Sequence, residues 1–287
     1  MRGMSNVAVF GFSDPFSSWS HLLMAAAAFV GGIFLLGKGR GSAARVSALA
    51  LYSGSLVFLF SMSGVYHLLE PGGAAREVLQ RLDHAGIWIL IAGTFTPIHV
   101  ILFRGAWRWL ILLIVWVIAI TGLVLEVIFF ATFPEWLTLT LFLGLGWIGA
   151  LTGYKFRTSF HGESLHQLVM GGIYYSLGGV IDFLKWPTLW TGIFGAHEVF
   201  HVFVILGAAS HWAFIHRWAN HPVANTIVFH VGIFPDTFVA TAVSDHLRVE
   251  AKDMDTLKAT IKRQVALKYH ESIEPRIHLR YFQEETL

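Results

Sequence analysis

Residues 108–128 read RWLILLIVWVIAITGLVLEVI, and this stretch decides the fold class of the chain. Between Trp109 and Leu125 it contains no charged side chain. Its length suits the roughly 20 helical residues that cross a bilayer core of about 30 Å. Six other apolar stretches flank it, separated by short loops that contain glycine and proline. The seven expected spans lie near residues 18–37, 46–69, 83–103, 108–128, 135–154, 166–184 and 195–217.

The composition of the whole chain is that of a membrane protein. Of its 287 residues, 55% are hydrophobic and 13% are charged, whereas soluble proteins carry about 25% charged residues. The mean hydropathy is +0.61. A net charge of +2 without a basic run argues against a nucleic-acid partner. Because the chain has no cysteine, disulfides and thiolate ligands are excluded, and a transition metal would need His, Asp, Glu or water.

The sequence changes in character after about residue 220. Of its 38 charged residues, 16 lie between Asp245 and Glu285, eight of each sign. Such a balanced, highly charged segment is typical of a solvated unit rather than of another span. We therefore expect an all-α membrane bundle of seven helices over residues 1–220. Residues 221–287 are expected to form a small soluble α+β domain of unknown role, with binding of a protein partner as one option.

This C-terminal segment has its own secondary-structure signals. Residues 226–243 predict a β-hairpin with its turn at Pro235-Asp236. Residues 253–270 predict a helix with Asp253 as its N-cap. The apolar positions of this helix are Leu257, Ile261 and Val265, and strands are expected beside it at 246–251 and 276–282.

Loop charges predict an orientation in the membrane. One side of the expected bundle carries eight basic residues: Lys38, Arg40, Arg45, Arg104, Arg108, Lys155, Arg157 and Arg217. The other side carries four: Arg2, Arg76, Arg81 and Lys185. The excess favours the first side as cytoplasmic, with the N-terminus outside and the C-terminus inside.

Three histidines are expected to meet at one face of the bundle. His67 ends the second apolar segment, and His197 and His201 begin the last, so alternating spans bring all three to the same side. Residues four apart on a helix project from one face, so His197 and His201 can hold one ion. That spacing alone is close to chance, and a pair of hydrogen-bonded bundle histidines is the alternative. His67 favours the metal site, since three neutral ligands and an open position are typical of catalytic zinc.

Asp83 and Ser63 are the candidate catalytic residues beside these histidines. Asp83 is expected to open the third segment at the same face. It is either the N-cap of that segment or a general base that holds a metal-bound water. Ser63 lies one turn before His67, so its hydroxyl could reach Asp83 or that water. The alternative for Ser63 is a hydroxyl that packs between helices.

Glu198 has a different expected role from the two histidines beside it. On a helix it projects about 100° away from His197, which favours a partner on another helix over a metal ligand. The run His197-Glu198-Val199-Phe200-His201 formally matches the H-E-x-x-H pattern of metalloproteases. Its place at the start of a membrane helix, with a third histidine upstream, disfavours a protease.

At these residues the chain resembles the progestin and adipoQ receptor (PAQR) family, including its bacterial hemolysin III-like members. Ser63–His67 looks like the S-x-x-x-H motif of that family, and Leu82–Ile87 looks like its Asp motif. His197–Val202 resembles the H-x-x-x-H motif, and Ser17–Leu22 resembles the segment before the first helix. The resemblance covers roughly residues 14–217 in order and spacing. Residues 222–287 have no recognised counterpart.

The resemblance implies a seven-helix bundle in which His67, His197 and His201 hold zinc. It implies that Asp83 engages a zinc-bound water, and it places the chain beside ceramidase-like membrane hydrolases. The implied reaction is attack of water on a lipid amide or ester carbonyl, with membrane lipids as substrate or ligand. The chain is expected to be a multi-pass protein of a bacterial inner membrane.

Two other functions remain open at this point. The chain could be a zinc-containing membrane sensor or receptor, or a hemolysin-like protein that perturbs membranes. The side of the membrane that the pocket faces is also undecided. The receptors of the family have a cytoplasmic N-terminus, whereas the charge count predicts an N-terminus outside.

Overall fold

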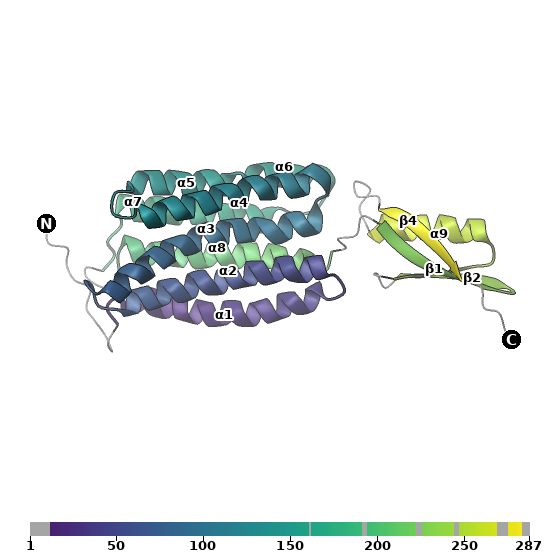
Figure 1. Ribbon diagram of the computed structural model, residues 1–287, viewed down its shortest axis with the longest axis horizontal. Helices are drawn as coiled ribbons and strands as arrows, with labels where there is room; N and C mark the ends of the chain where they lie inside the picture. The colour runs from purple at the N-terminus through teal and green to yellow at the C-terminus, as the bar shows by residue number, and fades with distance from the viewer. Residues whose placement is uncertain are drawn as a thin grey trace.

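The computed structural model describes residues 12–160, 162–190, 194–221, 226–243, 247–268 and 275–282. Figure 1 shows a group of long helices lying side by side, followed by a small sheet with one helix. The long helices are α1 (Pro15–Gly39), α2 (Ala43–Leu68), α3 (Ala74–Leu102), α4 (Gly105–Ile128), α5 (Glu135–Trp147), α6 (Gly149–Ser159), α7 (His166–Leu184) and α8 (Ala196–Trp218).

Six candidate membrane spans are present among the described residues. They are α1, α2, α3, α4, the continuous stretch α5–α6 over Glu135–Ser159, and α8. The helix α7 packs along α8, but it is not among the helices that are long and apolar enough to span by length and composition. The helical fold is therefore confirmed, whereas seven membrane crossings remain a prediction.

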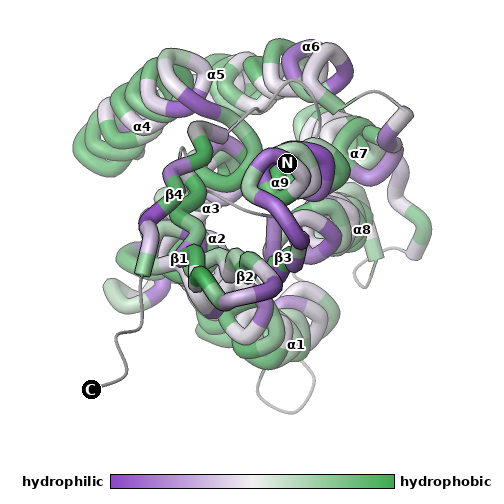
Figure 2. The backbone as a smooth tube through the Cα atoms, turned by 90° about the vertical axis from the view of Figure 1, so that its right-hand side faces the viewer, coloured by the Kyte–Doolittle hydropathy of each residue, from purple (hydrophilic) through white to green (hydrophobic). Residues whose placement is uncertain are grey.

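The helix α3 is the central element of the bundle. In its most apolar 18-residue window, 83% of the residues are buried, against 28% for α1 and 33% for α4. The end-on view shows α3 near the middle of the other helices (Figure 2). It also begins earlier than the sequence indicated, at Ala74 rather than near residue 83. Asp83 therefore lies within the helix, nine residues after its start, rather than at a helix end.

The helices α1 and α2 are in close contact at Gly64, one residue from Ser63. A Cβ atom on Gly64 would lie 2.7 Å from Leu22 Cγ and 3.0 Å from the Leu22 main-chain nitrogen. The Gly64 carbonyl also accepts a hydrogen bond of 2.7 Å from the Ser18 hydroxyl. A glycine here lets α1 sit directly against the end of α2.

Gly64→Ala should therefore destabilise the bundle, because the backbone atom of Leu22 cannot rotate away from the new methyl group. We expect a loss of about 1–3 kcal/mol, typical of overpacking, measured as a lower midpoint of thermal unfolding in detergent. Gly54→Ala on the same helix is the matched control, since nothing lies within 4 Å of the Cβ that it adds. An equal midpoint for both variants would contradict the tight contact.

The C-terminal unit is a four-stranded sheet covered by one helix. Its elements are β1 (Thr226–Phe234), β2 (Thr237–Ala242), β3 (Arg248–Ala251), α9 (Met254–Lys268) and β4 (Arg276–Phe282). The strand order is β3-β2-β1-β4. Strands β1, β2 and β3 pair in antiparallel fashion, and β4 pairs with β1 in parallel. The predicted hairpin, its turn at residues 235–236 and the last strand are confirmed.

The helix α9 also follows the prediction. Its three apolar positions, Leu257, Ile261 and Val265, are at most 4% exposed and join a hydrophobic cluster formed only by residues of this unit. Asp253 accepts a 2.7 Å hydrogen bond from the Thr256 main-chain nitrogen, and this contact holds the pKa of Asp253 below its usual value. The domain boundary near residue 220 stays a prediction, because residues 222–225 lie outside the described residues.

Candidate metal centre

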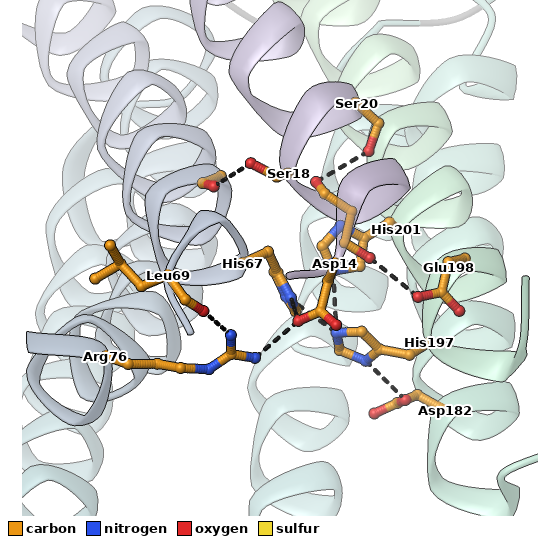
Figure 3. Close-up of polar contacts among 12 residues, drawn as sticks. Asp14, Ser18, Ser20, His67, Leu69, Arg76, Asp182, His197, Glu198 and His201 are labelled. Atoms are coloured by element: carbon orange, nitrogen blue, oxygen red, sulfur yellow. Dashed lines mark hydrogen bonds and ion pairs between the residues drawn. The ribbon is translucent and has the colours of Figure 1, made fainter. Parts of the chain in front are cut away.

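The three predicted histidines converge on one point at the end of the bundle (Figure 3). His67 comes from the last turn of α2, and His197 and His201 come from the first turns of α8. The Nε2 atom of His197 lies 3.2 Å from Nε2 of His67 and 3.1 Å from Nε2 of His201. One ligand atom from each ring lies within 4.8 Å of the other two. His67 and His201 are buried, and His197 is half-buried.

The outward-facing nitrogens of two of these rings contact carboxylates. The Nδ1 atom of His67 lies 3.0 Å from Oδ2 of Asp14, and Nδ1 of His197 lies 3.0 Å from Oδ1 of Asp182. An ionised carboxylate can only accept a hydrogen bond, so each Nδ1 carries the hydrogen and donates it. In the neutral rings the lone pair is then on Nε2, which faces the other histidines.

This donor set fits a zinc ion. Lone pairs on His67 and His197 would face each other at 3.2 Å without a proton between them, an arrangement that a shared cation stabilises. Tetrahedral zinc bonded to imidazole nitrogens at about 2.0–2.1 Å sets neighbouring nitrogens roughly 3.3–3.4 Å apart, close to the separations found here. Histidines that bind metals commonly donate their second N–H to a carboxylate, as both do here.

Asp83 and Ser63 lie beside the histidines, but Asp83 occupies a different position in its helix from the one expected. The N-cap of α3 is Gly73, so the interpretation of Asp83 as a helix cap is wrong. Asp83 lies inside α3 because that helix begins nine residues earlier. Its carboxyl group interacts with the side chains of Ser63, His67 and His197. Ser63 is 2% exposed and is hydrogen-bonded to Asp83. The histidine cluster and the interactions of Asp83 thus place all five predicted residues at the same end of the bundle.

Glu198 is a partner between helices, as predicted. Its Oε1 accepts a hydrogen bond of 3.3 Å from the hydroxyl of Ser17 on α1, and its Oε2 accepts one of 2.8 Å from the Gly195 main-chain nitrogen. Glu198 therefore joins α1 to the start of α8 and does not belong to the ligand cluster.

The predicted set of site residues omitted two carboxylates and one further histidine that lie at this centre. Asp14 precedes Pro15 and reads as an ordinary helix boundary, so nothing in the local pattern marks it. Asp182 carried a usable signal, because it is a lone acid in an apolar segment, where such groups are costly and often functional. His21 is 2% exposed and stacks on His201 with ring centroids 3.8 Å apart. The ring of His21, on α1, thus covers one side of the histidine cluster.

A second polar cluster lies between α3 and α4. Glu126 is 3% exposed, and its carboxylate contacts Nδ1 of His84 at 2.8 Å and Nε1 of Trp88 at 2.6 Å. These contacts satisfy both carboxylate oxygens of Glu126. The cluster therefore pairs the two ionisable groups His84 and Glu126 with each other, without involving the three histidines.

Comparison with known families assigns the helical part of the chain. A family model described as haemolysin-III related matches residues 12–212, which include all the site residues named above. The chain belongs to the haemolysin-III-related family. The family resemblance drawn from the motifs is thereby confirmed. The matched region ends before the C-terminal unit of this haemolysin-III-related protein.

Three relatives illustrate the extent of the similarity. Hemolysin-3 of Bacillus cereus is 31% identical over 169 residues, which cover 59% of this chain and 74% of the relative. A Hemolysin-3 homolog of Bacillus subtilis (strain 168) is 29% identical over 170 residues, covering 59% and 76%. The heptahelical transmembrane protein ADIPOR3 of Oryza sativa subsp. japonica is 27% identical over 176 residues, covering 56% and 44%.

Family membership and the apolar helices together establish the location of this haemolysin-III-related protein. It is an integral multi-pass membrane protein, and its bacterial relatives point to the cell membrane.

Proposed function

We propose that this protein binds zinc through His67, His197 and His201 and hydrolyses an amide or ester bond of a membrane lipid. The observation that carries the proposal is the convergence of three Nε2 atoms, two of them at separations of 3.1 and 3.2 Å from the third. Asp83 and Ser63 beside this cluster provide the remaining groups for catalysis. Zinc in such a site lowers the pKa of water towards neutrality and polarises a carbonyl group.

Asp83 is the group best placed to take a proton in this reaction. Its carboxyl group interacts electrostatically with His67, His84 and His197 and is hydrogen-bonded to Ser63. We therefore expect it to accept the proton of an attacking water and later transfer it to the leaving nitrogen or oxygen. The Ser63 hydroxyl contacts Asp83 and would orient the carboxylate for that transfer. His67 and His197, with their lone pairs directed inwards by the two carboxylates, would serve with His201 as ligands rather than as bases.

The depth of the site supports a lipid as the substrate. His67 is the last residue but one of α2, and His197 is the second residue of α8, so the cluster lies at the end of the bundle. Lipid amide and ester carbonyls lie at a similar depth, between the headgroups and the acyl chains. The nearby Trp186 and Trp190 are 71% and 66% exposed, and exposed Trp side chains favour the membrane interface.

Metal analysis combined with a substrate panel tests the proposal. Protein purified in detergent should contain about one zinc per chain. The same preparation should release fatty acid from at least one of a ceramide, an N-acyl amine or a glycerol ester, and removal of zinc by a chelator should stop the release. Protein without zinc, or hydrolysis that continues after chelation, would overturn it.

A second function follows from the names of two relatives. The Bacillus relatives are named Hemolysin-3 and Hemolysin-3 homolog, which favours membrane perturbation as the alternative. Dye release from phospholipid vesicles that contain the purified protein separates the two functions. Leakage that is unchanged in Asp83→Asn, without any lipid product, would favour perturbation over hydrolysis.

A further inference from the structure

We infer that Asp14 and Asp182 are positioning residues for the metal, and that Asp14 couples metal binding to the docking of the start of α1 on the end of α2. The inference rests on the proposed zinc site. It concerns residues outside the ligand set, on α7 and on the segment before α1.

Each carboxylate determines which nitrogen of its histidine faces the centre. The contacts of 3.0 Å from His67 Nδ1 to Asp14 and from His197 Nδ1 to Asp182 keep the hydrogen on Nδ1 and leave Nε2 free to bind. Without the acceptor, a neutral imidazole can place its hydrogen on Nε2, where it blocks the metal. The contact also makes the ring a stronger ligand, and loss of such a partner commonly lowers metal affinity by about 10–100-fold.

Both carboxylates are themselves held by basic side chains. Arg76 Nη2 lies 2.7 Å from Oδ2 of Asp14, the same oxygen that contacts His67. Lys185 Nζ lies 3.7 Å from Oδ2 of Asp182, while Oδ1 contacts His197. The cations offset the charge of the two acids. Asp14 and Asp182 can therefore orient the imidazoles while their own charges are balanced by Arg76 and Lys185.

Asp14 is fixed to the helix whose histidine it orients. Its main-chain nitrogen donates a 3.0 Å hydrogen bond to the His67 carbonyl, and Ser13 donates one of 3.3 Å to Leu68. Arg76 also donates to the Leu69 carbonyl, and its guanidinium lies 4.7 Å from the centre of the Tyr66 ring. Residues 13–14, Arg76 and the end of α2 thus form one assembly (Figure 3).

Zinc binding and the docking of the segment before α1 are then coupled reciprocally. If docked Asp14 strengthens zinc binding, zinc must stabilise the docked segment by the same factor. The main-chain amides of Ser13 and Asp14 should therefore exchange with solvent more slowly in the zinc form than after chelation. Amides at the far end of α2, next to Ser42, should show no such change.

Zinc affinities of four single variants and one double variant test the positioning role. Asp14→Asn and Asp182→Asn should each weaken zinc binding by about 10–100-fold in competition with a chromophoric chelator. Arg76→Gln should weaken it less, and its effect should largely disappear in the Asp14→Asn background, because it acts through Asp14. Glu163→Gln is the matched control, since Glu163 pairs with Arg217 at the other end of the bundle.

A cobalt spectrum separates positioning from a general loss of structure. Cobalt-loaded Asp14→Asn and Asp182→Asn should still show visible absorption bands of tetrahedral cobalt, but with shifted maxima. Glu163→Gln should reproduce the wild-type spectrum. Asn variants with wild-type zinc affinity and spectrum, in a protein that binds zinc, would overturn the positioning role and leave the proposed function standing. A wild-type protein that binds no zinc would overturn both.

Discussion

Combined replacement of His67 and His201 by alanine is expected to reduce bound zinc from about one equivalent per chain to background. The double change removes two of the three candidate ligand nitrogens. Only Nε2 of His197 remains, which contacts both of the others in the wild type. Zinc sites with a full set of protein ligands bind with about 10–16 kcal/mol at neutral pH, so losing two ligands should lower affinity by more than about 1000-fold. Inductively coupled plasma mass spectrometry of purified protein measures the loss.

The control for this experiment is another histidine of the same bundle. His166 is exposed at the start of α7, at the opposite end from the cluster, and His166→Ala should keep the full zinc content. Zinc retained in the His67→Ala and His201→Ala double variant would show that the metal binds elsewhere. The convergence of the three rings would then be a packing feature of the bundle.

Asp83→Asn is expected to lower lipid hydrolysis by about 10²–10⁴-fold, the usual contribution of a general base. The amide retains the shape of the side chain but cannot take a proton. The zinc content should stay near that of the wild type, because the three histidines keep their positions. Initial rates of fatty-acid release, measured on the substrate identified by the panel, give the effect.

Two comparisons make the Asp83 result specific. Glu135→Gln removes a carboxylate that is 77% exposed near the same end of the bundle and paired with Lys185, and it should leave the rate within about twofold of the wild type. Full hydrolysis by Asp83→Asn would exclude Asp83 as the base. If that variant kept a signalling activity that deletion of residues 221–287 abolished, zinc would be structural, and the receptor-like function would be favoured.

The fold class could be predicted from the sequence because its determinants are local. An uninterrupted apolar run such as 109–125 leaves the main chain no partner in a bilayer except its own helix. In the C-terminal unit, the turn at Pro235-Asp236 and the spacing of Leu257, Ile261 and Val265 likewise depend on neighbours within a few residues. The parallel pairing of β4 with β1 could not be predicted, since it joins segments separated by a whole helix.

The candidate site could be predicted only in part. Alternating spans were sufficient to bring His67, His197 and His201 to one end of the bundle. The position of Asp83 within its helix was less well predicted, because that helix starts at Ala74 in a segment with several charged side chains. Hydropathy alone places the helix start too late and makes an internal residue look like a cap.

The helical membrane bundle, the family and the three converging histidines could all be recognised from the amino-acid sequence. These depend on residue type and on order along the chain. Only the tertiary structure decided that Asp14 and Asp182 contact His67 and His197, and that the histidine nitrogens lie 3.1–3.2 Å apart. The reason is physical: a hydrogen bond between α2 and the start of α1, or between α7 and α8, depends on how the helices are rotated and how closely they pack. Neither property is a local feature of the chain.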